Sequence, residues 1–80
     1  MKELLYTIVE GLVIDKESIV INETTDAEGK LVLTLGVAKE DMGRVIGKQG
    51  KIIRSIRTIV RAKAAKEGVG ISIEVDEAEE

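Results

Sequence analysis

The sequence predicts an α+β fold in which three helices cover one face of a three-stranded mixed sheet. Two hydrophobic patterns predict it. Apolar residues recur at helical spacing over residues 2–13 and 50–67, whereas the segments 18–24, 31–37 and 71–75 have the β-branched content or the alternation of strands. Turn residues separate these segments, so each one can be assigned to its own element.

The first helix is expected over residues 2–13. Its apolar side chains follow the spacing i, i+1, i+4, i+5 of an amphipathic helix, and they comprise Leu4, Leu5, Ile8, Val9, Leu12 and Val13. Tyr6, the only aromatic residue, lies off this stripe, and Gly11 favours fraying near the end. Residues 15–17 are expected to turn the chain toward the sheet.

A β-hairpin is expected next. β-Branched residues favour a strand over residues 18–24, with Ile19 and Ile21 on one face. Residues 25–29 have turn chemistry, and leucines alternate with other residues along 31–37. The two strands should therefore pair in antiparallel orientation.

Two further helices and a last strand complete the order α-β-β-α-α-β. A short helix is predicted over residues 40–46, a long helix over 50–67 and a strand over 71–75. The two helices make a crossover, so the last strand should lie parallel to the second. Residues 76–80 are expected to form an acidic, solvated tail. The core stripe of the long helix is predicted to comprise Ile52, Ile53, Ile56, Ile59, Val60 and Ala64.

Composition argues against catalysis and metal binding. The chain has no histidine and no cysteine, which removes the commonest general base and the commonest zinc ligands. No nucleophile–base pair is recognisable, so we expect no enzyme, no cofactor and no metal site. The N-terminus lacks a signal-peptide pattern, and the apolar runs are too short to cross a membrane. We expect a single cytoplasmic domain over residues 1–80, without membrane insertion.

Charge is distributed unevenly along the chain. The formal net charge is −3. Residues 39–66, however, hold nine basic and two acidic residues, a net charge of +7, so the rest of the chain carries −10. Because local charge steers an anionic ligand, this segment predicts an anion-binding surface on one side of the molecule.

The most informative stretch is residues 45–53, which read Val-Ile-Gly-Lys-Gln-Gly-Lys-Ile-Ile. Gly47 and Gly50 bracket Lys48 and Gln49, and apolar pairs flank them on both sides. A glycine loop that opens a helix presents unpaired N–H donors and a partial positive charge, which suit phosphate. The glycines could instead only connect two helices. That alternative leaves the Lys-Gln pair and the surrounding positive charge unexplained.

The element order, with Gly-Lys-Gln-Gly between two adjacent helices, resembles the type II KH domain over the whole chain. With Ile-Arg-Thr-Ile-Val at residues 56–60, the sequence is similar to the stand-alone bacterial KH proteins of the KhpA family. The resemblance implies a single-stranded RNA-binding protein that acts as an RNA chaperone or post-transcriptional regulator. It also implies a homodimer, and pairing with a larger Jag-like KH protein (KhpB). One departure is Lys39, where many relatives start the helix with proline.

The resemblance also implies a set of site residues. The Gly-Lys-Gln-Gly loop would hold the RNA backbone, and an adjoining apolar groove would receive the bases. Neighbouring basic residues could contact phosphates, although Arg57 and Arg61 could equally belong to a solvated helix face. The expected RNA-binding residues are Arg44, Val45, Ile46, Gly47, Lys48, Gln49, Gly50, Lys51, Ile53 and Arg54.

A third face of the long helix carries small or uncharged side chains, namely Ser55, Thr58, Ala62 and Ala65, bordered by Ile59. It could be a contact surface for a second copy of the chain, or the first helix could cover it. The predicted dimer interface comprises Ser55, Thr58, Ile59 and Ala62. Two classes of function therefore remain open, an RNA-binding module and a protein-assembly module that works through partner contacts.

Overall fold

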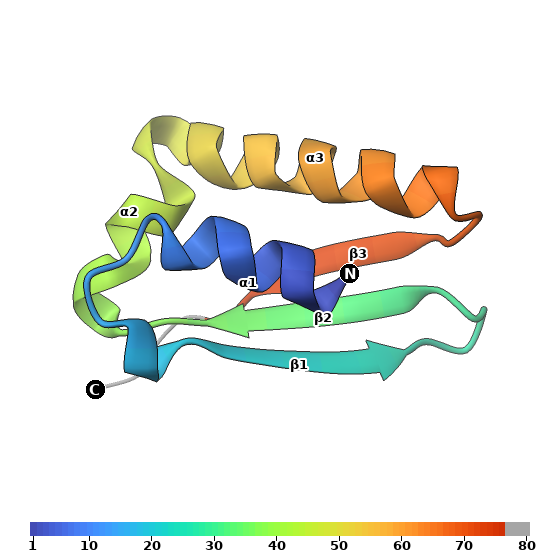
Figure 1. Ribbon diagram of the computed structural model, residues 1–80, viewed down its shortest axis with the longest axis horizontal. Coiled ribbons are helices and arrows are strands. Elements are labelled where there is room, and N and C mark those ends of the chain that lie inside the picture. The colour runs from blue at the N-terminus through green and yellow to red at the C-terminus, as the bar shows by residue number, and fades with distance from the viewer. Residues whose placement is uncertain (77–80) are drawn as a thin grey trace.

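A computed structural model describes residues 1–76 of the chain and confirms the α+β architecture (Figure 1). Residues 77–80, most of the predicted acidic tail, lie outside the described residues. Short 3₁₀ turns precede the second and third helices and the first strand. The helices and strands are α1 (Lys2–Glu10), β1 (Val20–Thr25), β2 (Leu31–Gly36), α2 (Met42–Ile46), α3 (Lys51–Lys66) and β3 (Ile71–Val75).

The sheet has the strand order β1-β2-β3, and both predicted pairings are confirmed. β1 pairs antiparallel with β2, and β2 pairs parallel with β3. The Asp26 carboxylate shapes the hairpin turn, because its Oδ1 accepts the N–H groups of Glu28 at 2.9 Å and Lys30 at 2.8 Å. Gly29 has φ +85° in the same turn, a value that suits glycine.

The three helices lie on one face of the sheet, and the core fills the space between the two layers (Figure 1). Leu5 and Val9 of α1 and Val60 of α3 are fully buried against the sheet leucines Leu33 and Leu35. Burial of each such aliphatic side chain contributes about 1.5–3 kcal/mol. This core fixes the positions of α2 and α3, which carry the glycine loop between them.

Several element boundaries differ from the prediction, and the structure gives a cause for two of them. α1 ends at Glu10 rather than residue 13, because the N–H groups of Gly11 and Leu12 donate to carbonyls three residues back, to Ile8 O at 3.2 Å and to Val9 O at 2.9 Å. β1 begins at Val20 rather than residue 18, because Lys16–Ser18 forms a 3₁₀ turn. The Ser18 hydroxyl closes that turn by donating to the Asp15 carboxylate at 2.7 Å. Such local side-chain bonds compete with strand pairing.

The prediction that Ile59 belongs to the core stripe of α3 is wrong. Its side chain is 51% exposed, whereas Ile53, Ile56, Val60 and Ala64 are buried. The buried positions follow the spacing i, i+3, i+7, i+11, which defines a narrow stripe along the helix. Ile59 does not belong to this stripe, and its side chain lies at the border between the core and the surface.

Candidate nucleic-acid interface

The glycine loop between α2 and α3 has an unusual backbone. Gly47 has φ +77°, Gln49 φ +57° and Gly50 φ +75°. A Cβ at Gly47 would lie 2.5 Å from Cγ1 of Ile52, closer than real contacts allow. Position 47 therefore needs glycine for its conformation and for the close approach of α3. Gln49, in contrast, adopts the left-handed region with a side chain.

The hydrogen bonds of the loop leave two N–H groups at its tip. Gly47 N donates to Gly43 O at 2.9 Å and Gly50 N to Gly47 O at 3.1 Å, while Lys51 N donates to the Lys48 carbonyl. Within residues 1–76 the N–H groups of Lys48 and Gln49 have no protein acceptor, and both residues are exposed. They lie beside the N-terminus of α3, whose dipole favours an anion.

The predicted basic residues divide into two groups. The side chains of Lys48 and Lys51 are exposed on and beside the loop. Two arginines bind the protein itself. Arg44 donates to Glu40 O and Asp41 Oδ1, each at 3.1 Å. Arg54 donates from Nε to Gly50 O at 3.3 Å and from its terminal nitrogen to Gln49 O at 2.6 Å.

The three apolar residues expected to line a base-binding groove are placed differently from one another. Val45 is completely buried and Ile53 is 6% exposed, so both are core side chains and neither presents a groove surface. Ile46 is half-buried at the end of α2 and retains exposed surface. Val45 and Ile53 belong to the hydrophobic core cluster, one on the helix before the loop and one on the helix after it.

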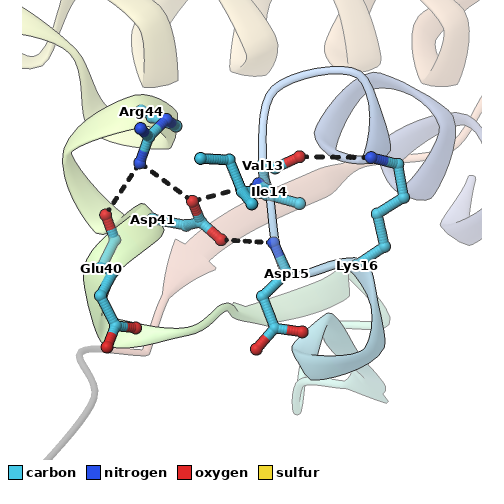
Figure 2. Close-up of polar contacts among 7 residues, drawn as sticks. All are labelled: Val13, Ile14, Asp15, Lys16, Glu40, Asp41 and Arg44. Carbon is cyan, nitrogen blue, oxygen red and sulfur yellow. Dashed lines mark hydrogen bonds and ion pairs between the residues drawn. The ribbon is translucent and has the colours of Figure 1, made fainter.

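A polar cluster around the buried side chain of Asp41, at the start of α2, was not anticipated from the sequence (Figure 2). The Asp41 side chain is the buried charged group of residues 1–76, with 1% exposure. Its Oδ2 accepts the N–H of Asp15 at 2.9 Å, and its Oδ1 accepts the N–H of Ile14 at 3.1 Å. Arg44, whose side chain is 47% exposed, pairs with the same carboxylate.

The surroundings of Asp41 lower the pKa of its carboxyl group below the ordinary value of 3.8. The hydrogen bond from the N–H of Asp15 is the largest cause. Burial opposes it, and the N–H of Ile14 and the charge of Arg44 lower the pKa further. Asp41 therefore ties the connection between α1 and β1 to the start of α2. The sequence alone does not reveal this role, because Ile14 and Asp15 lie more than 25 residues before Asp41.

Arg57 and Arg61, whose roles the sequence left open, differ in their contacts. Arg57 is half-buried and donates from Nε to the carbonyl of Ile73 on β3 at 3.1 Å, so it joins α3 to the sheet. Arg61 is exposed on α3. Arg57 thus has a structural contact, whereas Arg61 fits the description of a solvated helix face.

The predicted strip of small side chains on α3, which we call the α3 strip, is on the surface. It comprises Ser55, Thr58, Ala62 and Ala65. All four are exposed, as is Ile59 at their border, so the alternative that α1 covers the strip is wrong. The two hydroxyl groups of the strip are satisfied within the helix, since Ser55 donates to Lys51 O at 3.1 Å and Thr58 to Arg54 O at 3.0 Å. The strip therefore presents small side chains without unsatisfied polar groups.

Two searches of the described residues concern other kinds of site. No helix in residues 1–76 is long and apolar enough to cross a membrane. The same part of the chain contains no group of three or more histidine, cysteine, aspartate or glutamate side chains placed to hold a metal ion.

Comparison with known proteins agrees with the loop and the element order. A sequence model described as "KhpA/KhpB, KH domain" matches residues 2–75. The chain belongs to the KhpA/KhpB family of KH domains. The RNA-binding protein KhpA of Clostridium acetobutylicum is 45% identical over 94% of this chain and 99% of its own length. KhpA of Listeria monocytogenes is 49% identical over 96% of this chain and its whole length. Both relatives are named RNA-binding proteins.

A solved structure shows the same fold in a larger protein. The chain superposes on Aquifex aeolicus Era with a TM-score of 0.59 over 91% of this chain, at 21% sequence identity. It spans 28% of the Era chain. The likeness confirms the KH fold, and it shows the fold alone.

Proposed function

We propose that this family member binds single-stranded RNA through the Gly-Lys-Gln-Gly loop and performs no chemistry on it. The observation that carries the proposal is the loop tip, where the exposed residues Lys48 and Gln49 have N–H groups without an acceptor among residues 1–76. A KH domain uses such a GXXG loop to clamp four nucleotides of backbone. The curated relatives, named RNA-binding protein KhpA, support the same ligand.

The proposed contact surface lies around this loop. Lys48 and Lys51 offer flexible cations to phosphates, Gly47 and Gly50 let the backbone approach closely, and Ile46 offers exposed apolar surface to a base. The arginines predicted to contact RNA, Arg44 and Arg54, have their first contacts within the protein. Val45 and Ile53 support the loop from the core.

The proposed cellular role is that of an RNA chaperone or post-transcriptional regulator in the bacterial cytoplasm. We propose that the chain works as a dimer, either with a second copy or with a Jag-like KH protein of the KhpB type. The family description names KhpA and KhpB together, so a KhpB-type protein is a member of the same family and a candidate partner. The exposed α3 strip and Ile59 beside it support a pairing surface that comprises Ser55, Thr58, Ile59 and Ala62.

A second candidate function is a protein-assembly module that keeps the KH fold and works through partner contacts. The specific observation in its favour is Ile59, which is 51% exposed at the border of the α3 strip. Ile59 is not isolated, because the exposed Ser55 and Ala62 lie next to it on the helix at i−4 and i+3, and contiguous exposed apolar surface is typical of a contact site. Both functions are compatible in one molecule, because the strip and the loop tip occupy different parts of the chain.

Substitution of the loop tip tests the RNA-binding proposal. The double variant Lys48→Asp with Gln49→Asp should lose measurable binding to a short single-stranded RNA, because two carboxylates replace a cation and an amide where phosphate must approach. Its stability should change by no more than about 0.5 kcal/mol per site, since both side chains are exposed. Binding is measured by fluorescence anisotropy, and stability by urea unfolding.

A matched control changes the net charge equally elsewhere. Lys2→Asp with Asn22→Asp alters two exposed residues on α1 and β1 by the same total charge. This control should bind RNA with an affinity close to that of the wild type. Unchanged binding by the loop variant, at an unchanged dimer content, would favour the assembly function instead.

A further inference from the structure

Arg54 is the side chain that hydrogen-bonds to the backbone carbonyls of the loop. Its guanidinium group donates to the carbonyl of Gln49 at 2.6 Å and to the carbonyl of Gly50 at 3.3 Å. We infer that Arg54 is a positioning residue, which holds the loop in its phosphate-binding conformation instead of contacting the RNA. This inference rests on the proposed function, since it explains how the same site is kept ready for its ligand.

The geometry of the contact requires arginine. Nε and a terminal nitrogen of one planar guanidinium reach the carbonyls of two successive residues. A lysine carries its charge on one atom at the end of a flexible chain, so it cannot fix two carbonyls in this way. The effect of Arg54 on the loop should therefore depend on the shape of the side chain as well as its charge.

Gln49 is the residue that most needs such support. It has φ +57°, and it is the residue other than glycine with positive φ in the described chain. A residue with a side chain occupies this region only when the surrounding structure holds it there. The internal hydrogen bonds of the loop use the carbonyls of Gly47 and Lys48, and Arg54 takes the carbonyl of Gln49.

The same contact prepares the loop for an anion. A carbonyl oxygen carries partial negative charge, which would oppose a phosphate group bound to the neighbouring N–H groups. The positive charge of the Arg54 guanidinium offsets the partial negative charge of the Gln49 and Gly50 carbonyl oxygens, to which it is hydrogen-bonded. The N–H groups of Lys48 and Gln49, which have no acceptor within residues 1–76, are then the groups presented to the ligand.

Arg61 offers a matched control on the same helix. It lies seven residues after Arg54, which places both on the same face of α3, two turns apart. Arg61 is exposed like Arg54. Replacement of either arginine by alanine removes one positive charge from the same helix face, but only Arg54→Ala removes the contacts with the loop carbonyls.

A conservative variant and a rescue variant separate positioning from direct contact. Arg54→Lys keeps the positive charge and removes the pair of hydrogen bonds to the carbonyls of Gln49 and Gly50. Gln49→Gly removes the backbone strain that Arg54 would hold, because glycine adopts positive φ without cost. Affinity for a short single-stranded RNA is measured for Arg54→Ala, Arg54→Lys and Arg61→Ala, each with glutamine and with glycine at position 49. The comparison forms a double-mutant cycle.

A positioning role gives a distinct pattern. Arg54→Ala and Arg54→Lys should both weaken binding by about five- to tenfold, a change of about 1–1.4 kcal/mol, while Arg61→Ala changes it by less than about twofold. With glycine at position 49, the loss caused by Arg54→Ala should shrink to less than about twofold. A direct phosphate contact gives the opposite pattern. Arg54→Lys would then bind nearly as well as the wild type, and the loss caused by Arg54→Ala would be equal in both backgrounds.

A second measurement needs no RNA. In Arg54→Ala, the ¹⁵N order parameters of Gln49 and Gly50 should fall toward the range of flexible loops, below about 0.6, and Arg61→Ala should leave them unchanged. Unchanged order in Arg54→Ala would overturn the inference. If the wild type failed to bind RNA at all, the proposed function would be overturned, while the order parameters would still decide whether Arg54 holds the loop.

Discussion

Asp41 joins two parts of the chain that are 27 residues apart in sequence, through its contact with the N–H of Ile14. Its carboxylate also accepts the N–H of Asp15 and pairs with Arg44 (Figure 2). Without this acceptor, the two backbone donors of these part-buried hydrogen bonds would lose their protein partner, which costs stability. Asp41 thus fixes where α2 starts, one short helix before the glycine loop.

The lowered pKa of Asp41 predicts how stability depends on acid. Because the pKa is below 3.8 in the folded protein, the contribution of the carboxylate is fully present above that ordinary value. It should be lost as the pH falls through the lower folded pKa, since protonation then weakens the contacts. Asp41→Asn should be less stable than the wild type near neutral pH and lose less stability in acid. Urea unfolding over the acidic range measures this. The exposed carboxyl variant Glu23→Gln is the control, and parallel pH curves for Asp41→Asn and wild type would contradict the assignment.

Gly47 and Gly43 make a matched pair of glycines next to the loop. Gly47→Ala would place a Cβ 2.5 Å from Ile52 at φ +77°, so it should destabilise the fold by about 2–4 kcal/mol. A Cβ at Gly43 meets no atom within 4 Å, and Gly43 lies in α2, so Gly43→Ala should stabilise the fold by about 0.5 kcal/mol. Urea unfolding measures both changes. Equal effects of the two substitutions would show that Ile52 does not press against the loop.

The residue scale also shows the limit of sequence reasoning for the site. The loop, its exposed Lys48 and Gln49 and its glycines could be predicted, because the requirement for positive φ is local and visible in the residue types. The contacts of Arg54 and Arg44 could not, because a basic residue near the loop fits a phosphate contact and a backbone contact equally well. The burial of Val45 depends on tertiary packing in the core and likewise could not be predicted from the sequence.

At the scale of elements, the strip on α3 predicts dimerisation. A two-fold axis across the strip would set two α3 helices side by side, since each copy presents the same small side chains. Thr58→Glu or Ala62→Glu should then give folded monomers, because a carboxylate would be buried without a partner. Sedimentation measures the association. Ala27→Glu, in the exposed β1–β2 turn, is the control.

RNA length gives a second readout of the same pairing. In a dimer, two loops act on one RNA at an effective concentration that reaches roughly millimolar. The Thr58→Glu variant should therefore bind a long single-stranded RNA more weakly, with nearly unchanged affinity for a tetranucleotide. A wild type that stays monomeric at tens of micromolar, or variants that still dimerise, would show that the strip is not the interface.

The elements themselves could be predicted because their patterns are local. The alternating strand Ile71–Val75 has the expected bounds, and α3 differs from the expectation by one residue at each end. The errors occur where a nearby polar side chain or a glycine redirects the backbone, as at Gly11 and Ser18. Ile59 was misplaced for a different reason. A helix stripe predicted from hydrophobicity alone is wider than the surface that the sheet covers.

At the scale of the whole molecule, the fold separates the charges that the sequence places in different segments. The loop, α2 and α3 belong to the segment 39–66 with net charge +7. The β1–β2 hairpin carries Glu23, Asp26 and Glu28 in the opposite layer (Figure 1). An anionic polymer is therefore attracted to the helical layer and repelled from the hairpin, so the acidic net charge restricts where RNA can bind without preventing it.

This separation predicts salt-sensitive binding to single-stranded RNA, with little affinity for duplex. A clamp for four nucleotides, flanked by Lys48 and Lys51, offers three or four phosphate contacts, so log K should fall with log salt at a slope of about −2 to −3. Fluorescence anisotropy with a labelled single-stranded oligonucleotide over a series of KCl concentrations measures the slope. Lys51→Ala should reduce its magnitude by about 0.7, the value of one contact to a single strand. The distant substitution Lys2→Ala should leave the slope unchanged. An affinity that does not change between low and high salt would mean that RNA is held by something other than phosphate contacts at this loop.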